Sequence, residues 1–357
     1  MNKQNGASTI HVDLIRVVAI SAVLLLHVND LITQSVNDIG VLHWLIVVDI
    51  YSIISRMGVP FFIMLSGALL LGSSKKDEDI STFFKKRFTR IGIPFLFWGA
   101  VFFLWTFYVE TQFATQNFII NGVLRGPYPT FWYLYMLFGL YLITPLLRIM
   151  LAHFTDKLYK YFTCLWLIGL VLSPLIEFVS GWQIYFDGIV FLIPLCVGYF
   201  VIGAYLVKIQ IRRWILAVLT VSGFALTALA TFLVDGGSGG DAVFFFQGNS
   251  SPTMILATLS LFMLLNSYAK PQNISQIEKP SWAHRIMHVI SENTLPIYLM
   301  HMIIVYLLAH GFFGFVLTGR TFDPILSVPL AAAVTLTICL IIIVPLKKIP
   351  GLRKLIG

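Results

Sequence analysis

An apolar stretch near the start of the chain, residues 10–32, is long enough to cross a lipid bilayer, yet it contains Arg16 and His27. A membrane-spanning helix needs about 20 apolar residues, and an ionisable group in its middle costs roughly 2.5–3.5 kcal/mol on insertion scales. Such groups therefore normally face the protein interior or a watery cavity. Because eleven residues at about 100° each return to within about 20° of the starting face, Arg16 and His27 are predicted to line one wall, about 16 Å apart.

Nine further apolar stretches follow in the chain of 357 residues. Hydrophobic residues make up 58% of the chain and charged residues only 11%, which excludes an ordinary water-soluble fold. Barrel strands would be shorter and would alternate in polarity. We therefore predict an all-α, polytopic integral membrane protein that forms a single domain over residues 1–357, with no appended soluble domain. The ten helical segments are predicted at about 10–32, 44–71, 91–110, 130–149, 160–178, 184–206, 213–233, 253–268, 286–309 and 324–346.

The basic residues are distributed unevenly between the two sides of this arrangement. Of the 24 lysines and arginines, Arg125 and Arg320 fall on one side and Arg16 and Arg56 lie within segments, so the other twenty share a side with both termini. The positive-inside rule then predicts cytoplasmic termini in a multi-pass membrane protein. The same rule accounts for the net charge of +8 without a nucleic-acid partner.

A basic cluster, KKRFTR at residues 85–90, lies directly before the third segment. One interpretation is an orientation signal that also attracts anionic lipid headgroups. The other is a binding site for a phosphorylated ligand, because Arg87 and Arg90 are three apart on a helical turn and each guanidinium can grip a phosphate with two hydrogen bonds. The cluster alone leaves both interpretations open.

The ninth segment contains Glu292 and His301, with Pro296 between them. Proline is predicted to kink the helix and free a backbone carbonyl. Counted from the cytoplasmic side, Glu292 lies at about the depth of Arg16, and His301 at about the depth of His27. We therefore predict a charged lower level and an imidazole upper level; the alternative for His301 is a hydrogen bond to a neighbouring helix.

Other polar features of the sequence allow structural interpretations. Asp49 and Arg56, seven apart on the second segment, are a possible buried pair. Two long outer loops, 111–129 and 235–251, are either connectors or the rim of a groove. The three cysteines have no metal-ligand spacing, and no metal is expected.

Five blocks of sequence carry a family resemblance. They are HVDLIRVVAISAVLLLH (11–27), GVPFFIMLSGALL (58–70), KKRFTRIGIPFLFW (85–98), FWYLYMLFGLYLITPLL (131–147) and SENTLPIYLMH (291–301). In this order they resemble the membrane acyltransferase type 3 family in its free-standing form, with its Arg, ten residues and His in the first block and its Arg-x-x-Arg in the third. Residues from about 150 to 285 match in hydropathy only.

The resemblance implies an integral-membrane O-acyltransferase, multi-pass in the bacterial cytoplasmic membrane. Such an enzyme takes an acyl group, commonly acetyl, from cytoplasmic acyl-CoA as co-substrate, with no bound cofactor, and places it on a hydroxyl of a cell-envelope glycan or lipid-linked sugar. His27 is the expected catalytic base, because imidazole titrates near neutrality; an acyl-imidazole intermediate is the alternative. The expected substrate-binding residues are Arg16, Arg87, Arg90, Glu292, His301, Trp132 and Tyr133.

Intramembrane Arg, His and Glu are also typical of transport proteins. An exporter of a lipid-linked or polymeric glycan is therefore the alternative function, although the sequence shows no inverted halves with paired broken helices. A third possibility is a scaffold for an envelope-polysaccharide complex. Turnover of acyl-CoA by the purified protein distinguishes these classes.

Overall fold

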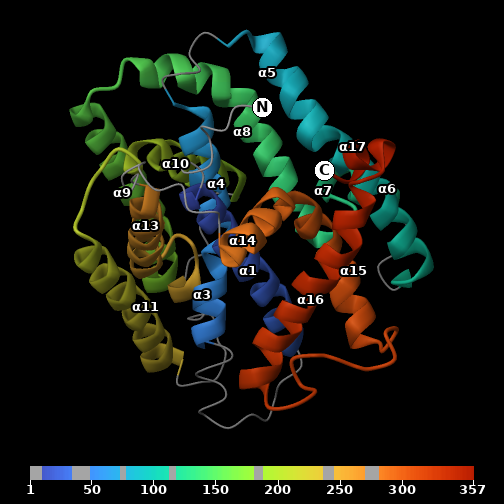
Figure 1. Ribbon diagram of the computed structural model, residues 1–357. Helices are drawn as coiled ribbons and strands as arrows, with labels where there is room; N and C mark the ends of the chain where they lie inside the picture. Colours follow the sequence, from blue (N-terminus) through green and yellow to red (C-terminus); the bar gives the residue numbers. More distant parts are fainter. Residues whose placement is uncertain are drawn as a thin grey trace.

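The computed structural model describes residues 10–33, 49–72, 78–111, 118–180, 188–235, 245–269 and 281–357, and of the side chains in 171–194 nothing is described. Every regular element in these ranges is a helix and none is a strand, which confirms the all-α prediction (Figure 1). The α-helices are α1 (Ile10–Thr33), α3 (Ser52–Arg56), α4 (Gly58–Leu70), α5 (Ile80–Arg87), α6 (Ile93–Tyr108), α7 (Phe118–Arg125), α8 (Trp132–Ala152), α9 (Asp156–Ser180), α10 (Gly188–Leu206), α11 (Arg213–Asp235), α13 (Pro252–Asn266), α14 (Trp282–Glu292), α15 (Thr294–Ala309), α16 (Pro324–Leu346) and α17 (Pro350–Ile356). A π-helical turn, η4 (Phe88–Gly92), joins α5 to α6, and short 3-10 turns occupy Pro129–Phe131 and Ser267–Ala269.

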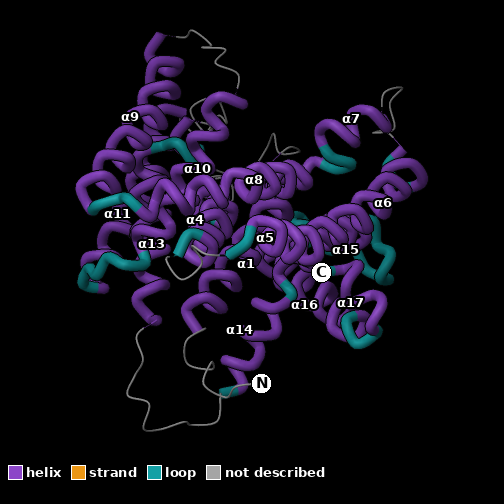
Figure 2. Tube along the Cα trace, turned by 90° about the horizontal axis from the view of Figure 1, so that it is seen from above, coloured by secondary structure: helices purple, strands orange, loops and turns teal. Residues whose placement is uncertain are grey.

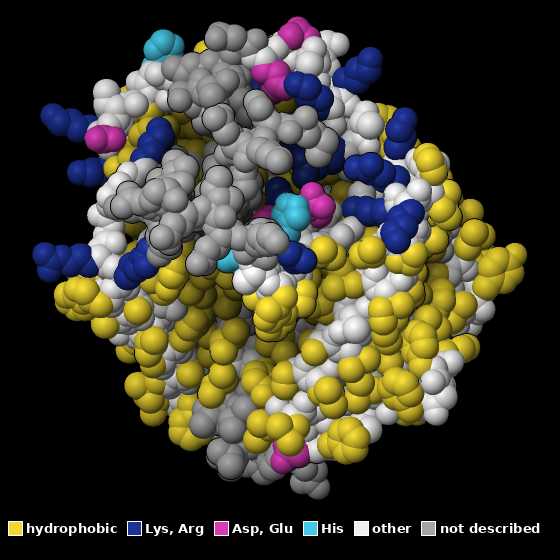
Figure 3. Space-filling view, in the orientation of Figure 1, with side chains coloured by type: hydrophobic (Ala, Val, Ile, Leu, Met, Phe, Trp, Pro, Cys, Tyr) yellow, Lys and Arg dark blue, Asp and Glu magenta, His cyan; other side chains and the backbone are white. Residues whose placement is uncertain are grey.

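Seven helical runs among the described residues are long and apolar enough to cross a membrane, and α14 with α15 makes an eighth if the bent pair is one span. The multi-pass architecture is therefore confirmed. Each of the ten segments expected from hydropathy overlaps a helix, and α9 and α10 are the two that do not count among these runs. The number ten and the side on which the termini lie stay predictions. Lys and Arg side chains gather at one end of the molecule, around α5 and α17, above a mainly apolar surface (Figure 3).

Helix α1 runs through the middle of the bundle and packs against α3, α4, α13, α14, α15 and α16. The side chains of Ile15, Ala19 and Ile20 are completely buried. A helix surrounded in this way presents its ionisable groups to protein and not to lipid, which is the condition that makes Arg16 and His27 tolerable in an apolar segment.

Helices α4 and α10 cross in backbone contact because each has a glycine at the crossing point. A Cβ atom on Gly67 would lie 1.7 Å from the carbonyl oxygen of Phe200, and a Cβ atom on Gly203 would lie 2.1 Å from that of Met64. Small residues permit such close approach between membrane helices, where packing and not hydrophobic burial drives association. This contact joins α10, and α9 packed against it, to the rest of the bundle, whereas α11 and α13 pack together and reach α1, α3 and α4 directly (Figure 2).

The ninth segment is broken as the proline predicts. Helices α14 and α15 meet at Asn293 with a bend of 77°. Pro296 has no N–H to donate to the carbonyl of Glu292, four residues earlier. Lys347, at the end of α16, instead donates its ammonium to that carbonyl at 3.2 Å, so the freed acceptor is satisfied by another helix.

The charges of the second segment both have partners on other segments. Asp49 is buried and accepts a hydrogen bond from the amide of Gln247 at 3.0 Å. The negative charge of Asp30, on α1, acts on Arg56. Of the two outer loops expected from the sequence, residues 112–117 and 236–244 lie outside the described residues.

Candidate active site

Two histidines from distant parts of the sequence meet inside the bundle. His27 on α1 and His301 on α15 are 274 residues apart, and Nδ1 of His27 lies 3.1 Å from Nε2 of His301. His301 is completely buried, whereas His27 keeps some accessible surface. Counting residues along the two helices predicted that the histidines lie at equal depth, and in the structure they are in direct contact.

The partners of the two rings assign their hydrogens. A backbone carbonyl can only accept, so Nδ1 of His27 carries the hydrogen that it donates to the Val23 carbonyl at 2.9 Å. By the same reasoning, Nδ1 of His301 donates to the Tyr298 carbonyl, which leaves Nε2 of neutral His301 as an acceptor facing His27. His27 therefore shares its Nδ1 hydrogen between Val23 and His301. Its Nε2 keeps a lone pair, as a general base requires.

A hollow of about 350 Å³, the inner pocket, opens toward the basic end of the molecule. It is lined by Arg16, Phe62, Ser66, Leu69, Leu70, Arg87, Arg90, Ile91, Tyr133, Leu137, Tyr141, Thr294, Leu295 and Tyr298. Three of the residues expected to bind substrate, Arg16, Arg87 and Arg90, thus come together from α1, α5 and η4. Guanidinium groups converging from three elements suit a polyanionic ligand.

Aromatic rings link the inner pocket to the histidine pair. The rings of Tyr133 and Tyr298, which line the pocket, lie 5.1 Å apart, and the ring of Tyr298 lies 5.6 Å from that of His301. The hydroxyl of Tyr298 donates to the carbonyl of Thr130 at 2.7 Å, which fixes the ring. Because Tyr298 contacts both regions, it connects the inner pocket to the imidazoles. The sequence analysis did not name Tyr298, although it lies three residues before His301 on the same helix face.

The lower charged level contains one residue, Asp13, that the sequence analysis did not name. Arg16 donates to the hydroxyl of Ser291 at 3.4 Å, and that hydroxyl donates to the carboxylate of Asp13, which is buried. Glu292 joins this chain through His288: its carboxylate, which is 66% exposed, is 3.3 Å from Nε2 of His288, and Nδ1 of His288 lies 2.9 Å from Asp13. The charges of Asp13 and Glu292 both act on Arg16, so the charged lower level contains Asp13 in addition to the two expected residues. Asp13 could have been found from the sequence, because it lies three residues before Arg16 on the same helix face.

Trp132 is also placed differently from its neighbour. Tyr133 is buried and lines the inner pocket, whereas the Trp132 side chain is 44% exposed and is not among the pocket's lining residues. Successive residues of a helix point about 100° apart, so only one of the two can face the pocket.

A buried arginine, Arg148 on α8, supports the wall of the inner pocket at Leu70. Its Nε donates to the Leu70 carbonyl at 2.8 Å, and its guanidinium pairs with Glu78 at 3.1 Å and lies over the Phe83 ring. Glu78 also pairs with Lys86 at 2.8 Å, and this hydrogen bond, together with Arg148, holds the pKa of the Glu78 carboxyl below its ordinary value despite partial burial. The Arg87 guanidinium also lies over the Phe83 ring, 5.4 Å from its centroid.

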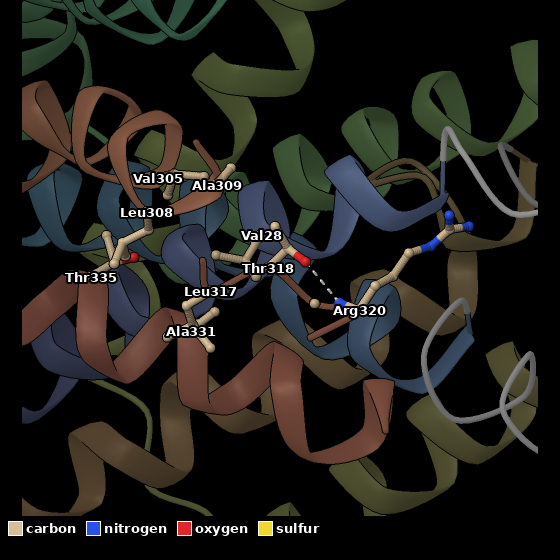
Figure 4. A pocket seen from close by; sticks show the side chains of 10 residues that line it. Val28, Val305, Leu308, Ala309, Leu317, Thr318, Arg320, Ala331 and Thr335 are labelled. Atoms are coloured by element: carbon tan, nitrogen blue, oxygen red, sulfur yellow. Dashed lines mark hydrogen bonds between the residues drawn. The ribbon is translucent and has the colours of Figure 1, made fainter. Parts of the chain in front are cut away.

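A second hollow, the outer pocket, has a volume of about 260 Å³ and is lined by residues of α1, α15 and α16 and of the 317–320 segment (Figure 4). Val28 follows His27 on α1, and Val305 follows His301 by four residues on α15. The lining is mainly apolar, but Thr335 is completely buried and its hydroxyl has no hydrogen-bond partner among the residues that the structure describes. Buried hydroxyls are normally paired, so this one is available to a ligand. Among the described residues, no group of three or more His, Cys, Asp or Glu is arranged to hold a metal ion.

Comparison with known proteins gives one match. A family model described as an acyltransferase domain matches residues 10–344, nearly the whole chain. Neither a curated protein nor a solved structure matches the chain. The matched range includes every element that forms the histidine pair and the inner pocket.

Proposed function

Because the chain belongs to the family of membrane acyltransferases, whose model spans residues 10–344, we propose that it transfers an acyl group, acetyl in the simplest case, from cytoplasmic acyl-CoA to a hydroxyl of a cell-envelope sugar or glycan. The single observation that carries this proposal is the lone pair on Nε2 of His27, assigned by the hydrogen bonds of the histidine pair. It supplies a base inside the bundle.

Donor binding is supported by the charge of the inner pocket. Acyl-CoA is a polyanion at its nucleotide end and carries its thioester at the end of a neutral arm. Arg16, Arg87 and Arg90 match the phosphates. The extended arm, about 15–20 Å by analogy with polypeptide reach, covers the roughly 16 Å between the levels of Arg16 and His27 on α1.

The transfer step then uses the histidine as base and as acid. Nε2 of His27 takes the proton of the acceptor hydroxyl while the hydroxyl oxygen attacks the thioester carbonyl. The C–S bond breaks, the new C–O ester bond remains, and the sulfur of CoA leaves with the proton returned by the imidazolium. During this step His301 accepts the Nδ1 hydrogen of His27, holds the ring in one orientation and stabilises its transient positive charge.

Two histidines also suit a two-step route. In that route Nε2 of His27 attacks the thioester, the C–S bond breaks and CoA leaves as a thiolate, so the acyl group rests on the imidazole. The acceptor hydroxyl then attacks the acyl carbon, the C–N bond to Nε2 breaks, and the hydroxyl proton goes to the CoA thiolate. Both routes require the same free nitrogen and the same partner, His301. They differ in whether a donor analogue labels the protein when no acceptor is present.

The acceptor is expected to approach from the outer pocket. That hollow adjoins the histidines through Val28 and Val305, and the unpaired hydroxyl of Thr335 can orient a polar group within an otherwise apolar lining. Donor and acceptor thus enter from opposite ends and meet at His27.

The experiment that tests this function combines two measurements. Purified protein in lipid nanodiscs should release free CoA from acetyl-CoA when a crude envelope-glycan acceptor is supplied, and the matched variant His27→Gln should not. Mass spectrometry of envelope glycans from a deletion strain should show loss of one acyl mass, restored by the wild-type gene. A protein that neither consumes acetyl-CoA nor alters any glycan mass would instead support the exporter.

A further inference from the structure

A third hollow of about 470 Å³, the basic pocket, lies beside the inner pocket and consists largely of cations. Its lining residues are Thr89, Arg90, Lys347, Lys348, Pro350, Arg353, Lys354 and Gly357. Five of these eight carry a positive side chain and none carries a negative one. In the space-filling view, the dark blue side chains near α17 surround this end of the molecule (Figure 3).

The basic pocket adjoins the inner pocket, because Arg90 lines both. Its other wall, α17, is held against α6: the indole N–H of Trp98 donates to the carbonyl of Ile356 at 3.3 Å, and Ile356 is buried. Arg353 and Lys354 therefore project from a fixed helix and not from a loose end.

The cations of the basic pocket are crowded. Lys347 is half-buried and donates to the Glu292 carbonyl. Burial lowers the pKa of Lys347; the charge of Glu292 opposes this effect, and the positive charges of Arg353 and Arg90 add to it. A concave site whose own charges repel one another gains most from an anion with more than one negative charge.

We propose that the basic pocket binds the 3′-phosphate at the nucleotide end of the acyl-CoA donor. The inference rests on the proposed function and deepens it. If the thioester lies at His27 and the diphosphate at the mouth of the inner pocket, the phosphorylated ribose comes next along the donor, and the hollow that shares Arg90 with that mouth is the one it reaches. The volume lies within the usual range of about 300–1,000 Å³ for small-molecule sites. The shared chemistry is a phosphomonoester, which a lipid headgroup also supplies.

The test compares two probes, CoA and 3′-dephospho-CoA, which differ only in that phosphate. Binding is measured by calorimetry on wild-type protein and on the double variant Arg353→Ala, Lys354→Ala, both in nanodiscs of neutral phosphatidylcholine. Wild type should bind CoA at least about tenfold more tightly than 3′-dephospho-CoA, as expected for charge-assisted hydrogen bonds to a phosphate. The double variant should lose this preference through weaker binding of CoA alone. Lys348→Ala should reduce it in part.

The matched control replaces two exposed lysines of α9, Lys157→Ala and Lys160→Ala, which removes the same charge away from the pocket and should keep the preference. A double variant that retains the preference, or that binds both probes more weakly by one factor, overturns the proposal. So does a wild type that binds both probes alike, an outcome that leaves the proposed function intact. A wild type that binds neither overturns the proposed function as well.

Anionic lipid is the other source of phosphate, and a second arm identifies it. The measurements are repeated in nanodiscs in which about one third of the phosphatidylcholine is replaced by phosphatidylglycerol. If the 3′-phosphate occupies the basic pocket, the tenfold preference is present in neutral lipid and is reduced by competition in anionic lipid. If the double variant differs from wild type only in anionic lipid, and only in lipid binding, the pocket holds headgroups and the proposal is wrong.

Discussion

The inner pocket and the histidine pair occupy neighbouring parts of the same bundle, yet they are built on opposite principles. Arg16, Arg87 and Arg90 in the inner pocket are guanidinium groups brought together from three elements. His27 and His301 are joined to each other by a hydrogen bond, and both are anchored to backbone carbonyls of their own helices. The difference assigns long-range attraction to one region and proton transfer to the other. The predictions below test whether the two tasks separate in this way.

The largest effect is expected at His27. His27→Ala should reduce kcat by about 10²–10⁴-fold, the usual contribution of general-base catalysis, with little change in the affinity for acyl-CoA. His27→Gln should be as inactive, because glutamine keeps hydrogen-bonding capacity but cannot take the proton. Steady-state kinetics with acetyl-CoA measures both values. An active His27→Gln protein would contradict the catalytic role and show that the His27 ring only packs between helices.

The inner pocket should show the reverse pattern. Arg87→Ala and Arg90→Ala should each raise the KM for acyl-CoA by roughly 10–100-fold, since a charge-assisted hydrogen bond contributes about 1.5–3 kcal/mol, and kcat at saturating donor should hold. Lysine at either position should restore part of the affinity, because it keeps the charge but lacks the planar fork. A fall in kcat at saturating donor would show that the two regions are not separate.

His301 is expected to act through His27 and not on the substrate. His301→Ala removes the acceptor for the Nδ1 hydrogen of His27, so kcat should fall by roughly tenfold while the KM for acyl-CoA stays the same. His301→Gln offers a carbonyl oxygen as acceptor and should recover part of the rate. The kinetics are compared with thermal melting of both variants, and equal losses in Ala and Gln variants of equal stability would argue against this positioning role.

The smallest effect concerns Glu78, which supports the inner pocket through Arg148. The lowered pKa of the Glu78 carboxyl means that its contribution is complete above the unfolded value of about 4.3 and is lost as the pH falls through the lower folded value. Donor affinity should therefore weaken at acid pH. Glu78→Gln should show a similar loss at neutral pH, of roughly two- to fivefold in KM, without a change in kcat. Binding measured between pH 3 and pH 7 tests the sign.

Counting along the sequence predicted the levels of the site better than its pairings. The depth argument brought His27 and His301 to one level, and they are in contact. The same argument placed Arg16 and Glu292 at one level, where the charge of Glu292 acts on Arg16 while its carboxylate contacts His288. Depth depends on the rise of a helix, which is nearly constant, whereas direction depends on how a broken helix is packed.

The sequence by itself determined the class of fold, the positions of the helical segments and the residue types available for chemistry. These follow from local rules: a bilayer requires about 20 apolar residues in a helix, and ionisable groups are kept from lipid. The family resemblance, confirmed by the match over residues 10–344, followed from five local blocks.

Only the tertiary structure decided which of these groups work together. The hydrogen bonds that leave Nε2 of His27 free involve residues 274 positions apart, and Arg90 became a wall of two pockets because α17 returns to α6. The hydroxyl of Ser291 joins Arg16 to Asp13 for the same reason. Such contacts arise from long-range packing between helices, and local sequence patterns do not specify them because each helix has several faces that could meet a neighbour.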